Sequence, residues 1–285
     1  MADENHAHCL INGSPGDQIS VFDRGLQYGD GVFETLAVIA GRPLYWQAHM
    51  QRLQEGCRRL AIPVPDPAGL LSETAALCAQ TDRRVVKIVM TRGVGGRGYP
   101  PPARPVPTRI VSCHPWPEYP GAWRFEGVRV GLCGQRLSPN AALAGIKHLN
   151  RLEQVLARAE WSDPNVAEGL MFDSRGRVVE GTMSNLFLVE NGALRTPDLS
   201  TCGVAGIIRA RMMELAQAVG IPCREAALDM ADIERAQEVF LTNSVIGLWP
   251  VTSLGDQRWP IGPTTQRLVQ ALIRDAGGPS TTSLW

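Results

Sequence analysis

The sequence predicts an α+β protein made of two domains, and three observations favour this class. The chain has 285 residues, which is enough for two modest hydrophobic cores. Strand-like and helix-like stretches follow one another without the regular alternation that is typical of a doubly wound parallel sheet. Proline clusters at 100–107 and 114–120 interrupt the pattern. We therefore predict an N-terminal α+β domain over residues 1–113, a linker over 114–122 and a C-terminal α+β domain over 123–285.

The elements of the N-terminal domain follow from hydrophobic periodicity. Apolar residues three or four positions apart, as in the run Met50, Leu53, Cys57 and Leu60, predict a helix. Apolar stretches bounded by turn residues predict strands. The predicted strands are 9–12, 19–22, 32–40, 43–45 and 84–91, and the predicted helices are 46–61 and 68–80.

The C-terminal domain shows the same mixture of patterns. Tight turns at 174–176 and 191–192 join neighbouring strands. A glycine, Gly203, precedes the first long helix of this domain. The predicted strands are 128–133, 169–173, 178–180, 185–189 and 238–242, and the predicted helices are 204–219 and 264–276.

Composition excludes several classes of function. A formal net charge of zero argues against electrostatic binding of nucleic acid. The seven cysteines contain no Cys-x-x-Cys pair and are odd in number, which favours reduced cytoplasmic thiols over a disulfide framework or a zinc site. The start of the chain lacks the basic and apolar pattern of a signal peptide, and no stretch is long enough to span a membrane. We expect a cytoplasmic globular protein without a metal site.

Lysine usage points to a reactive position. Lys87 and Lys147 are the only lysines among 28 lysine and arginine residues. A lysine amine can lose its proton and attack a carbonyl, whereas arginine stays protonated. We place Lys87 on an edge strand with its ammonium group in solvent. Lys147 is predicted to open a helix within residues 143–157, and it is the stronger candidate for amine chemistry.

Five stretches in this order resemble known motifs. Residues 23–34 (DRGLQYGDGVFE), 49–53 (HMQRL) and 179–187 (VEGTMSNLF) are similar to the signatures of fold-type IV pyridoxal-phosphate enzymes. Residues 91–99 (TRGVGGRGY) and 145–155 (GIKHLNRLEQV) resemble the aminodeoxychorismate lyases within that family. The resemblance extends from about residue 10 to 272. It implies the two-domain fold of the D-amino-acid aminotransferases, pyridoxal 5'-phosphate as cofactor, a small-molecule substrate and a homodimer.

The resemblance implies a role for each cofactor-binding residue. Lys147 binds the cofactor aldehyde covalently and later acts as the base. Glu180 faces the pyridine nitrogen, where a carboxylate keeps the ring protonated. Arg52 binds the phosphate. The amides of Ile207 and Ile208, at the positive end of a predicted helix, donate to the same phosphate.

Four further residues complete the set that the resemblance implies. Ser244 donates to the phosphate. Arg151 replaces the tyrosine of the branched-chain enzymes beside the phenolic oxygen of the cofactor, and on spacing alone it lies one helical turn beyond Lys147. Arg97 and Tyr99, in a glycine-rich loop, contact a substrate that carries two carboxylates.

The motifs imply a lyase that converts 4-amino-4-deoxychorismate to 4-aminobenzoate and pyruvate in folate biosynthesis. Two alternatives remain open. An aminotransferase for D-amino or branched-chain amino acids would use the same fold, cofactor and lysine. A binding protein without catalytic activity would retain only the scaffold.

Overall fold

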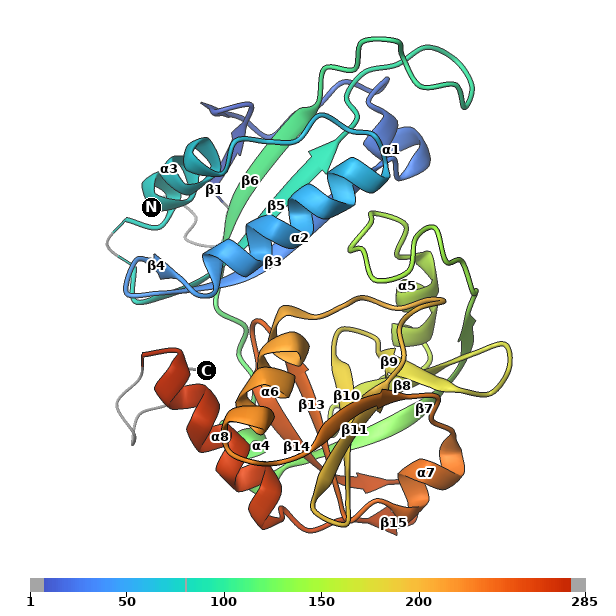
Figure 1. The fold of residues 1–285 in the computed structure, drawn as a ribbon. Coiled ribbons are helices and arrows are strands. Elements are labelled where there is room, and N and C mark those ends of the chain that lie inside the picture. The colour runs from blue at the N-terminus through green and yellow to red at the C-terminus, as the bar shows by residue number, and fades with distance from the viewer. Residues whose placement is uncertain (1–7, 80, 278–285) are drawn as a thin grey trace. The chain divides into compact units, whose positions relative to one another are not determined.

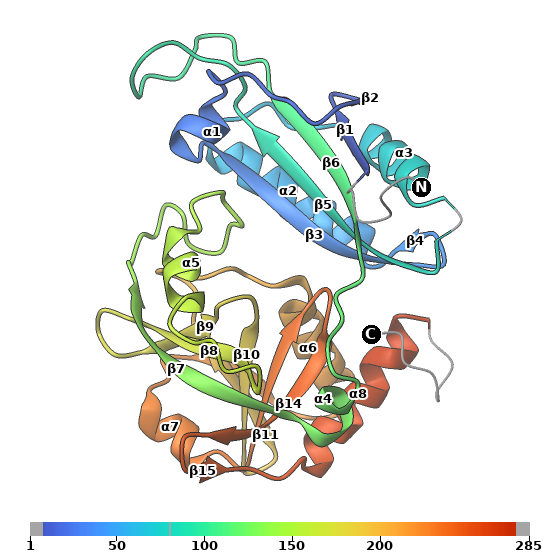
Figure 2. The same cartoon turned by 180° about the vertical axis from the view of Figure 1, so that it is seen from behind.

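The computed structural model describes residues 8–79 and 81–277, which form two compact units (Figures 1 and 2). The first unit comprises Met1–Glu118 together with Ile146–Asn150. The second unit comprises Tyr119–Gly145 and Arg151–Trp285. A short segment in the middle of the chain therefore packs on the first unit, although the residues on both sides of it belong to the second.

An antiparallel six-stranded sheet in the order β2-β1-β6-β5-β3-β4 forms the first unit. Its strands are β1 (His8–Ile11), β2 (Ser14–Pro15), β3 (Gly31–Ile39), β4 (Arg42–Pro43), β5 (Arg83–Thr91) and β6 (Thr108–Pro115). Its helices are α1 (Arg24–Tyr28), α2 (Trp46–Arg59) and α3 (Pro67–Leu77). Apolar side chains of β3, β5 and β6 pack against α2 and α3 and form one core.

Local sequence explains the long helices of this unit. Met50, Leu53 and Cys57 lie on one face of α2 and are buried in the core. Asp66 caps α3, because its carboxylate accepts hydrogen bonds from the amides of Ala68 and Gly69. Figure 1 shows α2 running along one side of the sheet. This helix carries Arg52 and therefore places it against β3.

The second unit is built on a mixed nine-stranded sheet in the order β12-β11-β10-β13-β14-β7-β8-β9, with β15 paired to β14. Its strands are β7 (Val128–Leu137), β8 (Val166–Asp173), β9 (Val178–Gly181), β10 (Asn185–Glu190), β11 (Ala193–Pro197), β12 (Cys223–Ala226), β13 (Glu238–Asn243), β14 (Gly247–Leu254) and β15 (Gln257–Arg258). Its helices are α4 (Ala122–Glu126), α5 (Leu152–Arg158), α6 (Ile207–Ala218), α7 (Met230–Arg235) and α8 (Pro263–Asp275). Helices α6 and α8 pack together and against β13.

The predicted α+β class is confirmed, and most predicted elements occur within a few residues of their expected bounds. The predicted strand at 19–22 is wrong, because these residues form an irregular, exposed segment before α1. Strands β6 and β14 were not predicted, since both contain or adjoin proline residues. Residue 80, the predicted end of the second helix, lies outside the described residues.

Two predictions about the lysines require correction. Lys147 does not open a helix, because α5 begins at Leu152 and Lys147 lies in an irregular segment that is hydrogen-bonded to β3. Lys87 is exposed as predicted, but it is not on an edge strand, since β5 lies between β3 and β6. Within residues 8–79 and 81–277, no helix has the length and apolar character needed to cross a membrane.

Candidate active site

Backbone pairing with β3 holds the segment that carries Lys147. The carbonyl of Lys147 accepts a hydrogen bond from the amide of Phe33 at 2.9 Å, and the amide of Leu149 donates to the carbonyl of Gly31 at 3.0 Å. The Lys147 side chain is half-buried, with Nζ 4.4 Å from the centre of the Phe33 ring. The ring is also 5.2 Å from Nζ of Lys87. The amine of Lys147 is therefore held in place by the sheet and an aromatic ring.

A buried charged cluster lies on the same strand, one residue beyond Phe33. Glu34 is fully buried and accepts hydrogen bonds from Nε and Nη2 of Arg52 at 2.8 and 2.6 Å. The other close partner of Glu34 is His49, whose Nδ1 lies 2.6 Å from Oε2. Burial acts to raise the pKa of Glu34, but the charge and hydrogen bonds of Arg52 outweigh it and lower the pKa to about 2. The carboxylate thus orients Arg52.

The charge on His49 responds to this cluster. Burial lowers the pKa of His49, and the charges of Arg52 and Lys147 lower it further, against the opposing effect of Glu34. A neutral imidazole donates from Nδ1 to the carboxylate. The structure thereby brings Arg52 and Lys147 into one electrostatic group with Glu34 and His49.

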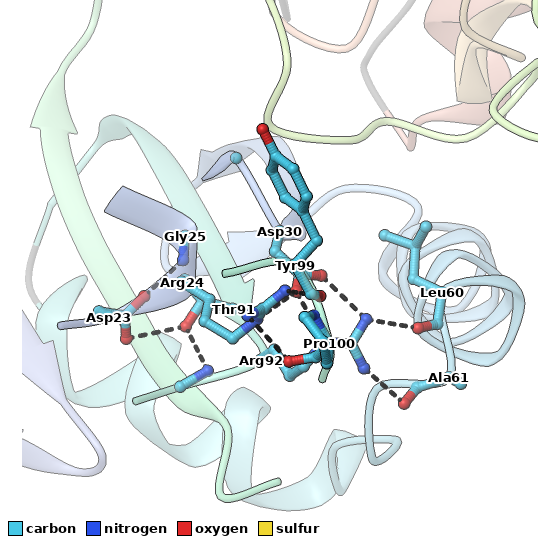
Figure 3. A network of polar contacts seen from close by, with 12 residues as sticks. Asp23, Arg24, Gly25, Asp30, Leu60, Ala61, Thr91, Arg92, Tyr99 and Pro100 are labelled. Atoms are coloured by element: carbon cyan, nitrogen blue, oxygen red, sulfur yellow. Dashed lines mark hydrogen bonds and ion pairs between the residues drawn. The ribbon is translucent and has the colours of Figure 1, made fainter. Parts of the chain in front are cut away.

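Arg97 and Tyr99 lie in the exposed loop that follows β5. The Tyr99 side chain is 83% exposed, and its ring centre lies 5.6 Å from that of Tyr28 on α1. Arg97 is also exposed. Figure 3 shows that the buried side chain of Arg24 contacts the backbone of this loop. The two predicted substrate residues therefore share a loop with a defined anchor.

In the second unit, Glu180 lies on β9 next to the segment that leads into α6. Glu180 is 4% exposed, and its Oε2 accepts a hydrogen bond from the amide of Val204 at 2.8 Å. Two residues further, Gly206 is the N-cap of α6, so that Ile207 and Ile208 are its first residues. A side chain at Gly206 would collide with Asn185. The carboxylate and the amino-terminal end of α6 are therefore held together.

Two turns next to Glu180 are fixed by polar side chains. The carboxylate of Glu168 is 1% exposed and accepts hydrogen bonds from the amides of Gly169, Thr182 and Met183. It also accepts from the hydroxyls of Thr182 and Ser184. These contacts fix the turn that directly follows Glu180.

Ser244 lies in the second of these turns, between β13 and β14. The Oδ1 atom of Asn243 accepts hydrogen bonds from the amides of Val245 and Ile246, both at 2.8 Å. Its Nδ2 donates to the carbonyl of Met183 at 3.1 Å. The turn that carries Ser244 is thus tied to the turn after Glu180.

Arg151 is not one helical turn beyond Lys147, because it is the N-cap residue of α5. It is half-buried, and burial lowers the pKa of its guanidinium, while the charges of Glu180 and Glu153 oppose this shift. Arg151 and Glu180 therefore interact electrostatically within the second unit.

Sequence reasoning assigned no role to Glu34, His49, Arg24 or Glu168. Glu34 and Glu168 each stand in a strand whose neighbours are largely apolar. A carboxylate in such a strand is costly unless it is paired, so its position was a usable indication of a buried network. The partners of these carboxylates come from distant parts of the chain and cannot be identified from spacing.

Each unit, taken by itself, contains groups of a kind that suits pyridoxal phosphate. The first unit holds an amine and an oriented guanidinium. The second unit holds a buried carboxylate beside a helix amino terminus. A glycine at the N-cap leaves the amides of Ile207 and Ile208 without a capping side chain. No group of three or more metal-ligating side chains occurs in the part of the chain that the structure describes.

Comparison with known proteins agrees with this chemistry. The family model described as amino-transferase class IV matches residues 31–254. Aminodeoxychorismate lyase of Vibrio harveyi is 36% identical over 262 residues, covering 90% of this chain and 97% of that protein. A putative branched-chain-amino-acid aminotransferase of Methanocaldococcus jannaschii is 33% identical over 238 residues, covering 82% of each.

Among solved structures, too, this chain is similar both to a lyase and to an aminotransferase. The crystal structure of 4-amino-4-deoxychorismate lyase from Pseudomonas aeruginosa matches with a TM-score of 0.90 and 52% identity, covering 94% of this chain and 98% of that one. The branched-chain amino acid aminotransferase of Escherichia coli matches with a TM-score of 0.84 and 25% identity, covering 98% and 97%. The fold is thus shared by lyases and aminotransferases.

Proposed function

Because this chain belongs to the class IV aminotransferase family, we propose that it is a pyridoxal-phosphate-dependent carbon–oxygen lyase. Its substrate is 4-amino-4-deoxychorismate, and its products are 4-aminobenzoate and pyruvate. The Vibrio and Pseudomonas relatives that are lyases support this choice. The observation that carries the proposal is the half-buried amine of Lys147, which backbone pairing with β3 holds in place.

Lys147 performs the proton transfers in this proposal. Bound pyridoxal phosphate supplies an aldehyde that condenses with amines and a pyridinium ring that withdraws electrons. Lys147 would hold the cofactor at this aldehyde in the resting enzyme. As the base, its amine would take a proton from the ring carbon that bears the substrate amine, the bond to the enolpyruvyl oxygen would break, and the substrate ring would become aromatic. Lys147 then returns its proton to the departing enolpyruvate.

The remaining cofactor residues would bind the phosphate of the cofactor and polarise its pyridine ring. Glu180 keeps the pyridine nitrogen protonated, because a buried carboxylate stabilises a proton on a facing base. Arg52, the amides of Ile207 and Ile208, and Ser244 hold the phosphate. The fork between Arg52 and Glu34 supports this role, since it orients the guanidinium before the cofactor binds.

Arg97 and Tyr99 would bind the substrate, and Arg151 would help to hold the cofactor. A guanidinium matches a carboxylate with two parallel hydrogen bonds, and the substrate carries two carboxylates. The Arg97→Ala variant should therefore raise the KM for aminodeoxychorismate and leave the visible absorbance of the holoenzyme unchanged. Kinetics like those of the wild type would remove Arg97 from the substrate site.

The direct test of function is incubation of the pure holoenzyme with aminodeoxychorismate and no keto acid. Pyruvate and 4-aminobenzoate should appear in equal amounts. An absence of pyruvate, together with amino transfer from a branched-chain or D-amino acid to 2-oxoglutarate, would make the aminotransferase alternative correct. A protein that fails to retain the cofactor after reconstitution would be a binding protein instead.

A homodimer in the cytoplasm is the proposed assembly and location, with a role in folate biosynthesis. Exposed apolar side chains support the dimer: Leu152, Val155 and Leu156 on α5 and Leu132 on the adjacent β7 are each more than half exposed. All seven cysteines are thiols, which suits a reducing compartment. Light scattering should give twice the chain mass, and Leu152→Asp should shift it to the monomer, whereas Phe125→Asp on α4 should not.

A further inference from the structure

One guanidinium holds the loop that carries Arg97 and Tyr99 (Figure 3). Nη1 of Arg24 donates to the carbonyls of Gly98 at 3.0 Å and Pro100 at 3.3 Å, and Nη2 donates to the carbonyl of Tyr99 at 2.9 Å. Arg24 is 4% exposed. Three successive carbonyls of an exposed loop therefore share one buried cation, which fixes the path of the backbone through them.

The half-buried carboxylate of Asp30 anchors this cation to the rest of the unit. Nε of Arg24 donates to Asp30 at 2.8 Å, and Arg92 donates to both oxygens of the same carboxylate at 2.7 and 2.9 Å. Arg92 also donates to the carbonyls of Leu60 and Ala61 at the end of α2. Burial acts to raise the pKa of Asp30, but hydrogen bonds from Arg92 and Arg24 outweigh it, so the pKa is lowered. One carboxylate thus joins the loop to the helix that carries Arg52.

Close packing leaves Arg24 little alternative position. Its backbone amide donates to the carbonyl of Gly93 at 2.9 Å. Its guanidinium carbon lies 4.9 Å from the centre of the Tyr28 ring, which in turn contacts Tyr99. The loop lies against the stem of Arg24 at Gly95, where an added Cβ would be 2.7 Å from Cδ of Arg24. At Gly96 an added Cβ would meet nothing within 4 Å.

We propose that Arg24 is a positioning residue for substrate binding, which acts by fixing residues 98–100 of the loop. Glycines at 93, 95, 96 and 98 make this loop flexible, and ordering it upon binding would cost conformational entropy. Because the contacts with Arg24 already order the loop in the free enzyme, substrate binding loses less conformational entropy. This inference rests on the proposed function in assigning Arg97 and Tyr99 to the substrate.

Two adjacent glycines provide a matched pair of variants. Gly95→Ala displaces the stem of Arg24 without removing any charge, whereas Gly96→Ala makes the same chemical change into open space. Arg24→Lys keeps the charge and loses the planar fork that reaches three carbonyls. We therefore expect Gly95→Ala and Arg24→Lys to release the loop and Gly96→Ala to leave it in place.

Limited tryptic cleavage of the holoenzyme measures release of the loop directly. Trypsin cleaves after arginine but not before proline. Arg104 precedes Pro105 and Arg92 is buried, so the bond after Arg97 is the tryptic site of this loop. Cleavage there should be about tenfold faster in Arg24→Lys and Gly95→Ala, because it follows the population of the opened loop. Gly96→Ala should match the wild type, and mass spectrometry identifies the cleaved bond.

Steady-state kinetics test the consequence for the substrate. In Arg24→Lys and Gly95→Ala, the KM for aminodeoxychorismate should rise about tenfold, with kcat within roughly twofold and the cofactor absorbance unchanged, because the lost contacts organise binding and not chemistry. Cleavage at the wild-type rate in both variants would show that Arg24 does not hold the loop. Faster cleavage with an unchanged KM would overturn its role in positioning.

The two readouts separate this inference from the proposed function. If the wild type releases no pyruvate, the lyase function fails, and the cleavage rates still decide whether Arg24 holds the loop. If Arg24→Lys fails to fold, the comparison between Gly95→Ala and Gly96→Ala carries the test alone. Equal cleavage and an equal KM in those two variants would contradict the inference.

Discussion

The two units stabilise their buried carboxylates in different ways. In the first unit, Glu34 is held by charged or titratable side chains, those of Arg52 and His49. In the second unit, Glu180 accepts from a backbone amide, and Glu168 accepts from three amides and two hydroxyls. Both arrangements satisfy oxygen atoms of the carboxylates, and in the first the carboxylate also orients the guanidinium of Arg52.

This difference has an energetic consequence. A buried carboxylate that loses its charge beside an arginine leaves a buried cation unpaired, which costs several kcal/mol. A carboxylate held by a neutral amide can be replaced by an amide oxygen at a lower cost, because the donor keeps an acceptor. We therefore expect changes in the first unit to affect stability, and matching changes at Glu180 to affect mainly the reaction.

The largest effect is expected at Lys147. Lys147→Arg should abolish turnover, because a guanidinium cannot condense with the cofactor aldehyde. The fold should persist, since the Lys147 backbone makes the contact with β3. Borohydride reduction of the wild-type holoenzyme should attach the cofactor to a peptide that contains Lys147. Attachment to Lys87 would contradict the assignment, and that lysine is a sharp control because it lies near the same Phe33 ring.

The next largest effect is expected for Glu34→Gln. The amide places a donor against Arg52 and His49 and removes the negative charge, so the first unit should lose about 3–5 kcal/mol of stability. Hydrogen exchange of the β3 and β5 amides reports this unit separately. Glu55→Gln on α2 is the matched control, since its pair with Arg58 is 55% exposed on both sides and should contribute less than about 1 kcal/mol. Equal effects of the two changes would show that the buried cluster is not stabilising.

Glu180→Gln should have the opposite effect, with a small change in stability and a large change in turnover. The amide oxygen can still accept from Val204, and only the attraction to the charge of Arg151 is lost, so stability should change by about 1 kcal/mol, less than in Glu34→Gln. Turnover should fall on the order of 100-fold, or about 2.7 kcal/mol, because a neutral amide stabilises the ring proton poorly. Cofactor absorbance and stopped-flow rates would separate binding from proton removal. Nearly full activity in this variant would make Glu180 a structural residue.

The sequence predicted the parts of this molecule that depend on local pattern. Helix α2 and strand β3 follow from periodicity. The roles of Lys147, Arg52 and Glu180 come from the resemblance of short motifs and stay predictions. Pairing between distant segments was not predictable from pattern alone. Lys147 was expected on a helix because residues 152–158 have helical spacing, whereas hydrogen bonds to β3, more than 100 residues earlier, hold its own segment in an irregular conformation. The hydrogen bonds from Arg24 to the carbonyls of residues 98–100 were not predicted for the same reason.

The smallest effect is a pH dependence that separates the two titrating members of the buried cluster in the first unit, His49 and Glu34. His49 has a lowered pKa in the fold, so its unfolded form takes up a proton first, and stability should decline as pH falls below about 6.5. Glu34, with a pKa of about 2, contributes stability above its ordinary pKa near 4.5 and loses it as pH falls from there toward 2. Hydrogen exchange of β3 between pH 7 and 5 should therefore show a loss of about 1–2 kcal/mol in the wild type. His49→Gln should flatten this slope, because glutamine does not titrate, while the decline below pH 4.5 should persist. An unchanged slope in His49→Gln would place the responsible proton on another group and would leave Arg52 as the main partner of Glu34.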